Sequence, residues 1–283
     1  MIDAIVSGAS GFIGQALCDD LRVKGWNVLP MTSANGDVAI QNTWTPLPSA
    51  RVFFHLAGRS FVPESWARGP DFVRANVLGT EHALAYCRQH GARLVLASAY
   101  VYGIPQRLPI RESDPARPNN PYALTKRMAE QLCEFAVQFQ GVVATSLRIF
   151  NVFGPGQRAE FLIPKVLQQV KAGKEIRLLD LTPRRDYVYL SDVVDAFIMA
   201  SEVNTGFHII NVGSGRSLSV AEIVDKIQAV AGTRLPLVAD LVERRQEIPD
   251  VVADICLAQQ VLGWQPQQSF EGGIEQILKR VRL

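Results

Sequence analysis

The chain opens with a short apolar run that leads directly into a glycine-rich turn. Residues 2–7 predict a buried strand, and the turn Gly8-Ala9-Ser10-Gly11-Phe12-Ile13-Gly14 follows at once. Residues 12–24 then place their apolar side chains on one helical face, and Gly25 ends the pattern. A strand that turns through glycines into a helix is typical of the first unit of a parallel sheet covered by helices.

The same alternation of apolar runs and helical patterns continues through the first half of the chain. Further strands are predicted at 27–31, 51–57, 93–97 and 143–149, and helices at 72–89 and 122–140. The run 51–57 shows little polar alternation, as expected when helices cover both faces of a sheet. We therefore predict an α/β protein with a doubly wound parallel sheet, the Rossmann fold.

The three glycines of the first turn suit three different tasks. Gly8 permits the tight turn, Gly11 lets a ligand approach the backbone, and Gly14 lets the helix pack closely on the sheet. The unpaired N–H groups at the start of the helix, which begins at Phe12 and Ile13, suit phosphate oxygens. A purely structural turn is the alternative, but the strand and helix on either side favour a dinucleotide pyrophosphate.

The residues after the second strand bear on the choice of cofactor. An acidic residue there would accept the ribose hydroxyls of NAD, but these positions hold Thr32, Ser33 and Ala34. No charge there repels a 2′-phosphate, and no arginine is nearby to bind one. We expect NADP or NAD, with a slight preference for NADP. Asp37, followed by Val38, is expected either to contact the adenine or to cap its own loop.

The rhythm of the chain changes after the segment 151–156, and the later elements are shorter. We predict a dinucleotide-binding domain of residues 1–155 with returning segments near 186–212. Residues 156–283 are expected to form a smaller C-terminal α/β lobe that binds the substrate. The chain would then pass between the two lobes more than once.

Composition excludes several classes of function. Of 283 residues, 48% are apolar and 20% charged, and the net charge of +2 gives no field that would recruit nucleic acid or an anionic membrane. The four cysteines are scattered, without Cys-x-x-Cys or Cys/His spacing, so we expect no metal site and a reducing, cytoplasmic compartment. No secretory leader precedes the first strand, and no apolar run reaches the roughly 18 residues that span a bilayer.

Tyr122 and Lys126 lie one helical turn apart, and Ser98 ends the buried run upstream of them. The ammonium of Lys126 and a positively charged nicotinamide ring are expected to lower the pKa of the phenol. Ser98 would reach the sheet edge where ligands bind, and its hydroxyl could hydrogen-bond a substrate oxygen. A Tyr-x-x-x-Lys pair alone is usually a surface pair, but with this serine it indicates proton transfer beside a carbonyl or alcohol.

Eight segments together resemble the extended short-chain dehydrogenases/reductases, in the group of nucleotide-sugar epimerases, dehydratases and reductases. They are Gly8–Gly14, Phe54–Gly58, Asn76–Thr80, Ser98–Gly103, Tyr122–Lys126, Leu147–Gly156, Arg185–Tyr189 and Asn211–Gly213. The segments span nearly the whole chain. The resemblance implies that Ser98, Tyr122 and Lys126 are the catalytic residues and that Lys126 also holds the nicotinamide ribose.

The resemblance also implies binding roles. The expected cofactor-binding residues are Gly8, Gly11, Phe12, Ile13, Gly14, Thr32, Ser33, Asp37, Val38, Leu56, Ala57, Gly58, Asn76, Tyr122 and Lys126. The expected substrate-binding residues are Ser60, Ser98, Tyr100, Asn151, Arg185 and Arg244. The two arginines resemble phosphate clamps. A salt bridge with Asp186 is the alternative for Arg185, and the register around Arg244 is less well defined.

Three reactions of the family use the same catalytic serine, tyrosine and lysine. A dehydratase needs an acid and a base after the catalytic hydroxyl, whereas Ala99 and Tyr100 stand here, so dehydration is disfavoured. Reduction of an NDP-4-keto-6-deoxyhexose is preferred over 4-epimerisation with tightly bound NAD. The chain is short for an epimerase with a full second lobe, and the missing acidic residue after the second strand permits NADPH. Residues 58–66 also resemble GDP-4-keto-6-deoxymannose reductases. A protein that binds NAD(P) without turnover is the third alternative, which the three retained catalytic residues disfavour.

A homodimer is also expected. The predicted helices 72–89 and 122–140 would pair with their copies to form a four-helix interface, as in relatives. Within the second of these helices, Met128, Leu132, Phe135 and Phe139 are expected to face the core of their own chain.

Overall fold

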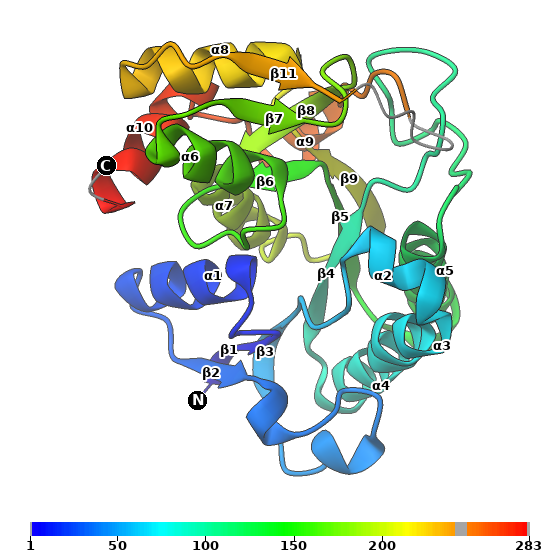
Figure 1. The fold of residues 1–283 in the computed structure, drawn as a ribbon. Coiled ribbons are helices and arrows are strands. Elements are labelled where there is room, and N and C mark those ends of the chain that lie inside the picture. The colour runs from blue at the N-terminus through cyan, green and yellow to red at the C-terminus, as the bar shows by residue number, and fades with distance from the viewer. Residues whose placement is uncertain (1, 241–247, 282–283) are drawn as a thin grey trace.

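A computed structural model describes residues 2–240 and 248–281, and its centre is a six-stranded sheet (Figure 1). The strand order is β2-β1-β3-β4-β5-β9, and every pair is parallel. The strands are β1 (Ile2–Ser7), β2 (Val28–Met31), β3 (Ala50–His55), β4 (Arg93–Ala99), β5 (Ala144–Ile149) and β9 (Phe207–Val212). The predicted doubly wound α/β fold is confirmed.

Helices cover both faces of this sheet, since its strands point apolar side chains alternately to either side. Val6 and Phe54 pack against the helices of one face, and Ile5 and Phe53 against those of the other. The first face carries α1 (Phe12–Val23), α7 (Leu190–Ala200) and α9 (Cys256–Leu262), and the second carries α4 (Gly79–His90) and α5 (Pro121–Gln140). Both faces of the strands are therefore buried, which explains their unbroken apolar sequence.

Helix α5 begins and ends at residues suited to those positions. The Asn120 side chain accepts a hydrogen bond from the N–H of Ala123, Pro121 occupies the first helical position, and Gly141 closes the helix with a positive φ. The side chains that α5 buries are mainly small, which lets the helix lie close to the sheet.

The expected orientation of α5 was wrong for its aromatic residues. Phe135 is 52% exposed and Phe139 is 65% exposed, and Met128 is also exposed; Leu132 is half-buried. Ala129, Cys133 and Ala136 take the inward positions instead. The helix carries two apolar stripes, and the smaller side chains face the sheet because they permit the closer approach.

The segment predicted as one helix over 72–89 is interrupted in the structure. A π-helical turn, Val73–Leu78, separates α3 (Gly69–Phe72) from α4. Shorter elements complete this half of the molecule: α2 (Val62–Ala67) and two 3₁₀ turns, Ser33–Asn35 and Gln41–Thr43. A π-helical turn often marks a functional position inside a helix, and this one contains Asn76.

The remaining elements form a second layer of small sheets beyond the carboxyl ends of the main strands (Figure 1). One sheet has the order β10-β8-β6 and the other pairs β11 with β7. The elements are β6 (Asn151–Phe153), α6 (Leu162–Ala172), β7 (Ile176–Leu178), β8 (Arg184–Tyr189), β10 (Ser217–Ser219), α8 (Val220–Ala231), β11 (Leu237–Ala239) and α10 (Phe270–Val281). Their apolar side chains form a separate cluster.

Two sequence expectations about the whole chain concern membranes and thiols. Within residues 2–240 and 248–281, no helix has both the length and the apolar character that crossing a bilayer requires. All four cysteines are free thiols, three of them buried.

The close packing of α1 on β1 gives a testable prediction. A Cβ at Gly14 would lie 2.1 Å from the carbonyl oxygen of Gly8, so Gly14→Ala must push the helix away from the sheet. We expect a loss of about 2–4 kcal/mol in unfolding free energy, measured by urea denaturation. Gly69→Ala is the matched control, because nothing lies within 4 Å of its Cβ. Equal stability of both variants would contradict the packing argument.

Candidate active site

The strand order places a crevice where the chain changes direction. From β1 the chain passes to β2 on one side and then to β3 on the other, and doubly wound sheets bind ligands at the carboxyl ends of the strands at this point. A groove of about 540 Å³ lies there. The predicted cofactor residues that line it are Gly8, Gly11, Thr32, Ser33, Asp37, Val38, Leu56, Ala57 and Gly58.

The glycine-rich turn fits a dinucleotide because side chains would fill its cradle. Gly8 has φ +72°, and a Cβ there would lie 2.7 Å from the Ala57 nitrogen. Helix α1 starts at Phe12 with no side chain capping it, so its first N–H groups, from Phe12 to Gly14, have no intrahelical partner. Backbone donors at the start of a helix are suited to pyrophosphate oxygens.

The outer end of the groove differs from the sequence expectation. Asp37 accepts hydrogen bonds from the N–H of Ala39 and, at 3.2 Å, from the Arg74 guanidinium. The Ala39 N–H and then Arg74 lower the pKa of this carboxyl group. Arg59 lines the same groove. The expectation that no arginine lies near was therefore wrong, because both arginines come from a segment remote in sequence from Thr32.

Asn76 holds the turn that follows β3. Its Oδ1 accepts from the Arg59 N–H at 2.8 Å, and its Nδ2 donates to the Arg59 carbonyl and to Thr125 Oγ1. The Thr125 hydroxyl in turn donates to the Tyr122 carbonyl. Asn76 thus links the Gly58 turn to the first turn of α5. A Cβ at Gly58 would lie 2.5 Å from Asn76 Oδ1, so this position requires glycine.

Lys126 connects the groove to the end of β4. Its side chain is buried, and its Nζ donates to the Ala97 carbonyl at 2.8 Å. A Cβ built at Gly58, which lines the groove, would lie 3.5 Å from the same Nζ. Burial lowers the pKa of Lys126 to about 8, an effect that the charge of Glu130 partly opposes. The ammonium is therefore still charged at neutral pH.

Tyr122 lies in the first turn of α5, with its ring packed edge-on to Phe72 at 6.3 Å between centroids. Burial raises the pKa of this phenol. This direction is opposite to the one expected from Lys126, and a phenol shifted in this way keeps its proton at neutral pH.

Ser98 lies at the end of β4 and has a partner that the motifs did not predict. Its Oγ donates to Oε1 of Glu130 at 2.7 Å, and both side chains are buried. Arg148 of β5, directly opposite Ser98 in the strand register, donates to both oxygens of the same carboxylate. The one sequence signal was the helical spacing, since Glu130 follows Tyr122 and Lys126 at four-residue intervals.

The expected substrate residues outside the groove have contacts of their own. Ser60 is exposed after the Gly58 turn, and the Tyr100 hydroxyl donates to the Gly103 carbonyl. Asn151 Nδ2 donates to the Asp186 carbonyl, and Arg185 Nη1 donates to the carbonyls of Arg184 and Ile248.

The Asp186 carboxylate accepts from the N–H groups of Ser214, Gly215 and Ala253. Arg244 lies outside the described residues.

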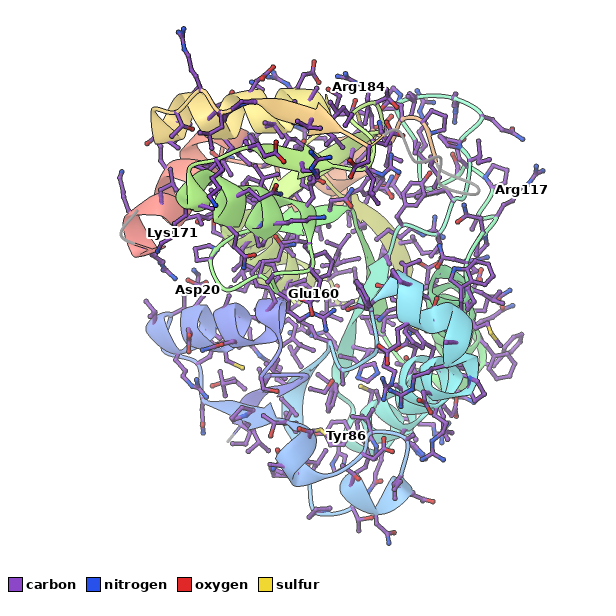
Figure 2. The ribbon with its side chains drawn as sticks, in the orientation of Figure 1. Asp20, Tyr86, Arg117, Glu160, Lys171 and Arg184 are labelled. Atoms are coloured by element: carbon purple, nitrogen blue, oxygen red, sulfur yellow. The ribbon has the colours of Figure 1, made fainter. Side chains whose placement is uncertain are left out.

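The second lobe reaches the start of α1 through the segment 154–161. A Cβ at Gly154 would lie 3.5 Å from the Phe12 ring. Figure 2 labels Glu160, further along this segment, above the start of α1 in that view. Arg158 stacks over the rings of Phe61 and Phe161 at 5.3 and 5.5 Å. These contacts bring the second lobe against the turn that follows β3.

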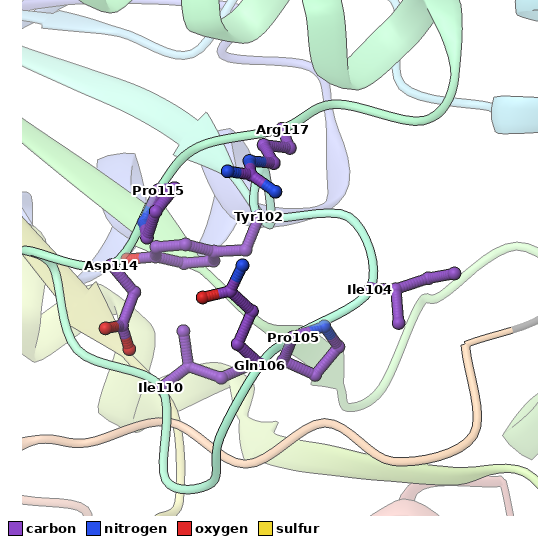
Figure 3. A pocket seen from close by; sticks show the side chains of 8 residues that line it. All are labelled: Tyr102, Ile104, Pro105, Gln106, Ile110, Asp114, Pro115 and Arg117. Carbon is purple, nitrogen blue, oxygen red and sulfur yellow. The ribbon is translucent and has the colours of Figure 1, made fainter.

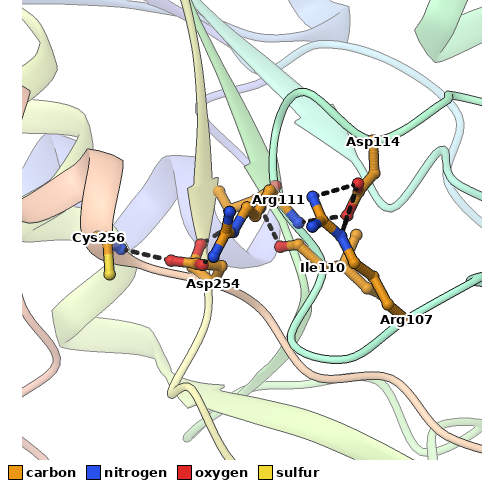
Figure 4. Close-up of polar contacts among 7 residues, drawn as sticks. Arg107, Ile110, Arg111, Asp114, Asp254 and Cys256 are labelled. Carbon is orange, nitrogen blue, oxygen red and sulfur yellow. Dashed lines mark hydrogen bonds and ion pairs between the residues drawn. The ribbon is translucent and has the colours of Figure 1, made fainter.

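The loop that follows β4 is held in place by two ion pairs. Arg107 pairs with Asp114, and Arg111 pairs with Asp254 (Figure 4). The small hollow inside this loop, next to Tyr102, has a volume of about 20 Å³ and is too small for a cofactor (Figure 3). The loop is therefore a structural wall, and the groove at the glycine-rich turn is the larger opening.

Residues 4–213 match the NAD dependent epimerase/dehydratase family. The chain belongs to this family. The nucleotide-sugar epimerase/dehydratase/reductase resemblance and the predicted class of NAD(P)-dependent enzyme are thereby confirmed.

Individual relatives carry two different activities in their names. The GDP-6-deoxy-D-mannose reductase of Pseudomonas aeruginosa is 29% identical, covering 96% of this chain and 95% of the relative. The UDP-glucose 4-epimerase of Corynebacterium glutamicum is 36% identical over 76% of this chain and 71% of its own. Among solved structures, MoeE5 in complex with UDP-glucuronic acid and NAD has a TM-score of 0.91 at 32% identity, covering 99% of both chains.

The burial of Lys126 predicts an unusual effect on stability. Its pKa of about 8 lies below the unfolded value of 10.5, so at pH 7 the buried charge lowers the unfolding free energy by on the order of 3 kcal/mol. Removing Lys126 would also remove its hydrogen bond to the Ala97 carbonyl, which offsets about 1 kcal/mol of the gain. We expect Lys126→Met to raise the unfolding free energy at pH 7 by about 1–3 kcal/mol.

The pH dependence checks this cause. Between about pH 8 and 10.5 the unfolded wild type binds the extra proton, so its stability rises with pH and the advantage of Lys126→Met shrinks. Urea denaturation at a series of pH values measures this. The exposed Lys171→Met is the control and should show no such trend. A Lys126→Met protein much less stable than wild type at pH 7 would contradict the assignment.

Proposed function

We propose that this chain reduces the 4-keto group of a nucleotide-linked 4-keto-6-deoxyhexose, with NADPH as the preferred cofactor over NADH. The observation that carries the proposal is the buried, charged Lys126, whose Nζ lies against the Gly58 turn of the cofactor groove, with the protonated Tyr122 phenol one turn earlier on α5. A protonated phenol at neutral pH is the group that reduction of a ketone needs.

The charge of the groove supports the choice of NADPH. Thr32 and Ser33 follow β2 with neutral hydroxyl groups, and the two carboxylates that line the groove, Asp37 and Asp71, are each paired with an arginine. Arg74, the partner of Asp37, and Arg59, which contacts Glu64 and Asp71, also line it. A 2′-phosphate would therefore meet hydroxyl groups and ion pairs rather than an unpaired carboxylate, and arginine is suited to phosphate through its forked donors.

The chain's own residues would then divide the work of reduction. Bound NADPH supplies the hydride that reaches the C4 carbon. Tyr122 gives its phenolic proton to the C4 oxygen, and Lys126, which is charged below about pH 8, stabilises the phenolate that remains. Ser98 hydrogen-bonds the same oxygen atom of the sugar once reduction has made it a hydroxyl group.

The nucleotide and sugar would lie between the groove and the second lobe. We assign this contact to Ser60, Tyr100, Asn151 and Arg185, with Arg244 as a second phosphate clamp. The named relatives support the substrate class, since they include a GDP-6-deoxy-D-mannose reductase and a structure holding UDP-glucuronic acid. The four free thiols favour the cytoplasm as the compartment.

A 4-epimerase with bound NAD is the second candidate, favoured by relatives named UDP-glucose 4-epimerase. The two reactions differ in how the cofactor is used. A reductase consumes one NADPH for each ketone, whereas an epimerase interconverts C4 alcohols and leaves its NAD unchanged. Incubation of the purified protein with 4-keto and 4-hydroxy nucleotide sugars, followed by product chromatography, separates them.

Tyr122→Phe tests the catalytic assignment. Loss of the proton donor is expected to lower kcat by about 10²–10⁴-fold, while NADPH affinity changes little because the groove is untouched. NADPH oxidation and cofactor fluorescence measure the two quantities. Tyr86→Phe is the control, since the Tyr86 hydroxyl bonds the Pro48 carbonyl away from the groove. If wild type and Tyr122→Phe were equally inert on all nucleotide sugars, a cofactor-binding protein without turnover would be the better conclusion.

The exposed face of α5 supports the homodimer. Phe135 and Phe139 stack at 5.0 Å between ring centroids on this face, and Leu124 and Met128 continue it toward the start of the helix. A contiguous exposed apolar stripe on a helix marks an interaction site. A second copy of α5 would cover the stripe with the same residues, as a two-fold interface requires.

Charge on this stripe is expected to prevent dimerisation. We predict that Phe135→Glu with Phe139→Glu sediments as a monomer at micromolar concentration while the wild type sediments as a dimer. The control is Val23→Glu, at an exposed residue of α1. A wild-type protein that is monomeric throughout, or a variant that remains dimeric, would rule out this interface.

A further inference from the structure

The carboxylate of Glu130 is fully buried and has a complete set of hydrogen-bond donors. Its Oε1 accepts from Ser98 Oγ and from Arg148 Nε, and its Oε2 accepts from Arg148 Nη2 and from Arg127 Nη1. Arg148 is 2% exposed and also lies over the Tyr102 ring. The proposed reaction uses none of these three charged groups directly.

The donor and acceptor roles in this cluster fix the orientation of Ser98. The Glu130 carboxylate receives three guanidinium N–H groups, so its oxygens act as hydrogen-bond acceptors. A serine hydroxyl has one proton and two lone pairs. Because that proton is donated to Glu130, the oxygen of Ser98 can offer only lone pairs to anything else that approaches it.

Two elements hold the carboxylate against Ser98. Tyr122, Lys126 and Glu130 follow one another at four-residue spacing on one face of α5, so Glu130 continues the line of the catalytic pair. Arg148 stands opposite Ser98 in the register of β4 and β5. Its two bonds to Glu130 are parallel, which fixes the plane of the carboxylate.

We propose that Glu130 is a positioning residue: it accepts the hydrogen bond of the Ser98 hydroxyl, so that the serine oxygen faces the active site as a hydrogen-bond acceptor. Its partner is the C4 hydroxyl of a nucleotide sugar. Tyr122 is then the only one of the two hydroxyl residues that donates to a C4 ketone. The inference rests on the proposed function of this site.

Glu130→Asp is the sharpest single variant. It keeps the charge that Arg148 and Arg127 require but withdraws the carboxylate from Ser98 by about one carbon–carbon bond. We expect the affinity of the NADP⁺-loaded protein for a nucleotide sugar with a C4 hydroxyl to fall by about tenfold, as for loss of a hydrogen bond to a charged group, with NADPH affinity unchanged. Glu134→Asp, at an exposed position one turn further along α5, is the matched control.

A double-mutant cycle separates positioning from a general structural effect. In a Ser98→Ala background no serine hydroxyl is left for Glu130 to orient, so Glu130→Asp should change this affinity by less than about twofold. An equal loss in both backgrounds, or no loss in either, would overturn the proposal. Should Glu130→Asp fail to fold, the charge-neutral pair Glu130→Leu with Arg148→Met replaces it in the same cycle.

Binding keeps the inference separate from the proposed function. The same four proteins, loaded with NADP⁺, are titrated calorimetrically with UDP-glucose and GDP-mannose, which carry a C4 hydroxyl. Glu130→Asp should weaken the sugar that binds only where Ser98 is present. If wild type shows no turnover but the binding cycle shows this coupling, the proposed reaction fails and the positioning role stands. If the wild type turns over but sugar binding shows no coupling between Ser98 and Glu130, the positioning role alone is overturned. If neither turnover nor coupling is seen, the proposed reaction and the positioning role are both overturned.

Discussion

A buried ammonium group joins helix α5 to the central sheet. Lys126 donates to the Ala97 carbonyl near the end of β4, and the helix can lie close enough for this bond because it buries alanines and a cysteine. The position of Tyr122, one turn earlier, and that of Glu130, one turn later, follow from this anchor. A charge held away from water is costly, so the site depends on packing elsewhere in the sheet to keep it there.

The strand–helix rhythm of the first half was enough to predict the fold. The glycine-rich turn had a local signature, because Gly14 packs against the carbonyl of Gly8 six residues earlier, although the Ala57 nitrogen that crowds Gly8 is remote in sequence. The orientation of α5 could not be obtained in this way. Its sequence carries two apolar stripes, and only the closeness of the sheet decides that Ala129 and Cys133 turn inward while Phe135 turns outward.

The electrostatic predictions failed for a related reason. Arg59 reaches the groove from the turn after β3, and Arg74 from the π-helical turn Val73–Leu78, both far along the chain from Thr32. The pKa of Tyr122 is raised because the folded protein buries the phenol, an effect that residue spacing does not reveal. Glu130 looked like an ordinary helix residue, and its role became visible only once β5 placed Arg148 against it. The partners and pKa values of charged side chains depend on tertiary neighbours more than the formation of strands and helices does.

Tyr122, Lys126 and Ser98 do not by themselves separate reduction from epimerisation. Both reactions place a C4 carbon near the nicotinamide and an oxygen near the phenol, and they differ only in whether the cofactor leaves after one hydride transfer. The difference must therefore lie where the cofactor and sugar are held. Asp37 and Asp71 along the groove are held in ion pairs with arginines, so the NADPH that we propose would bring its 2′-phosphate against ion pairs and not against a free carboxylate. Because NADPH is used as a reductant that is consumed in each turnover, the proposed cofactor and the proposed reduction support each other.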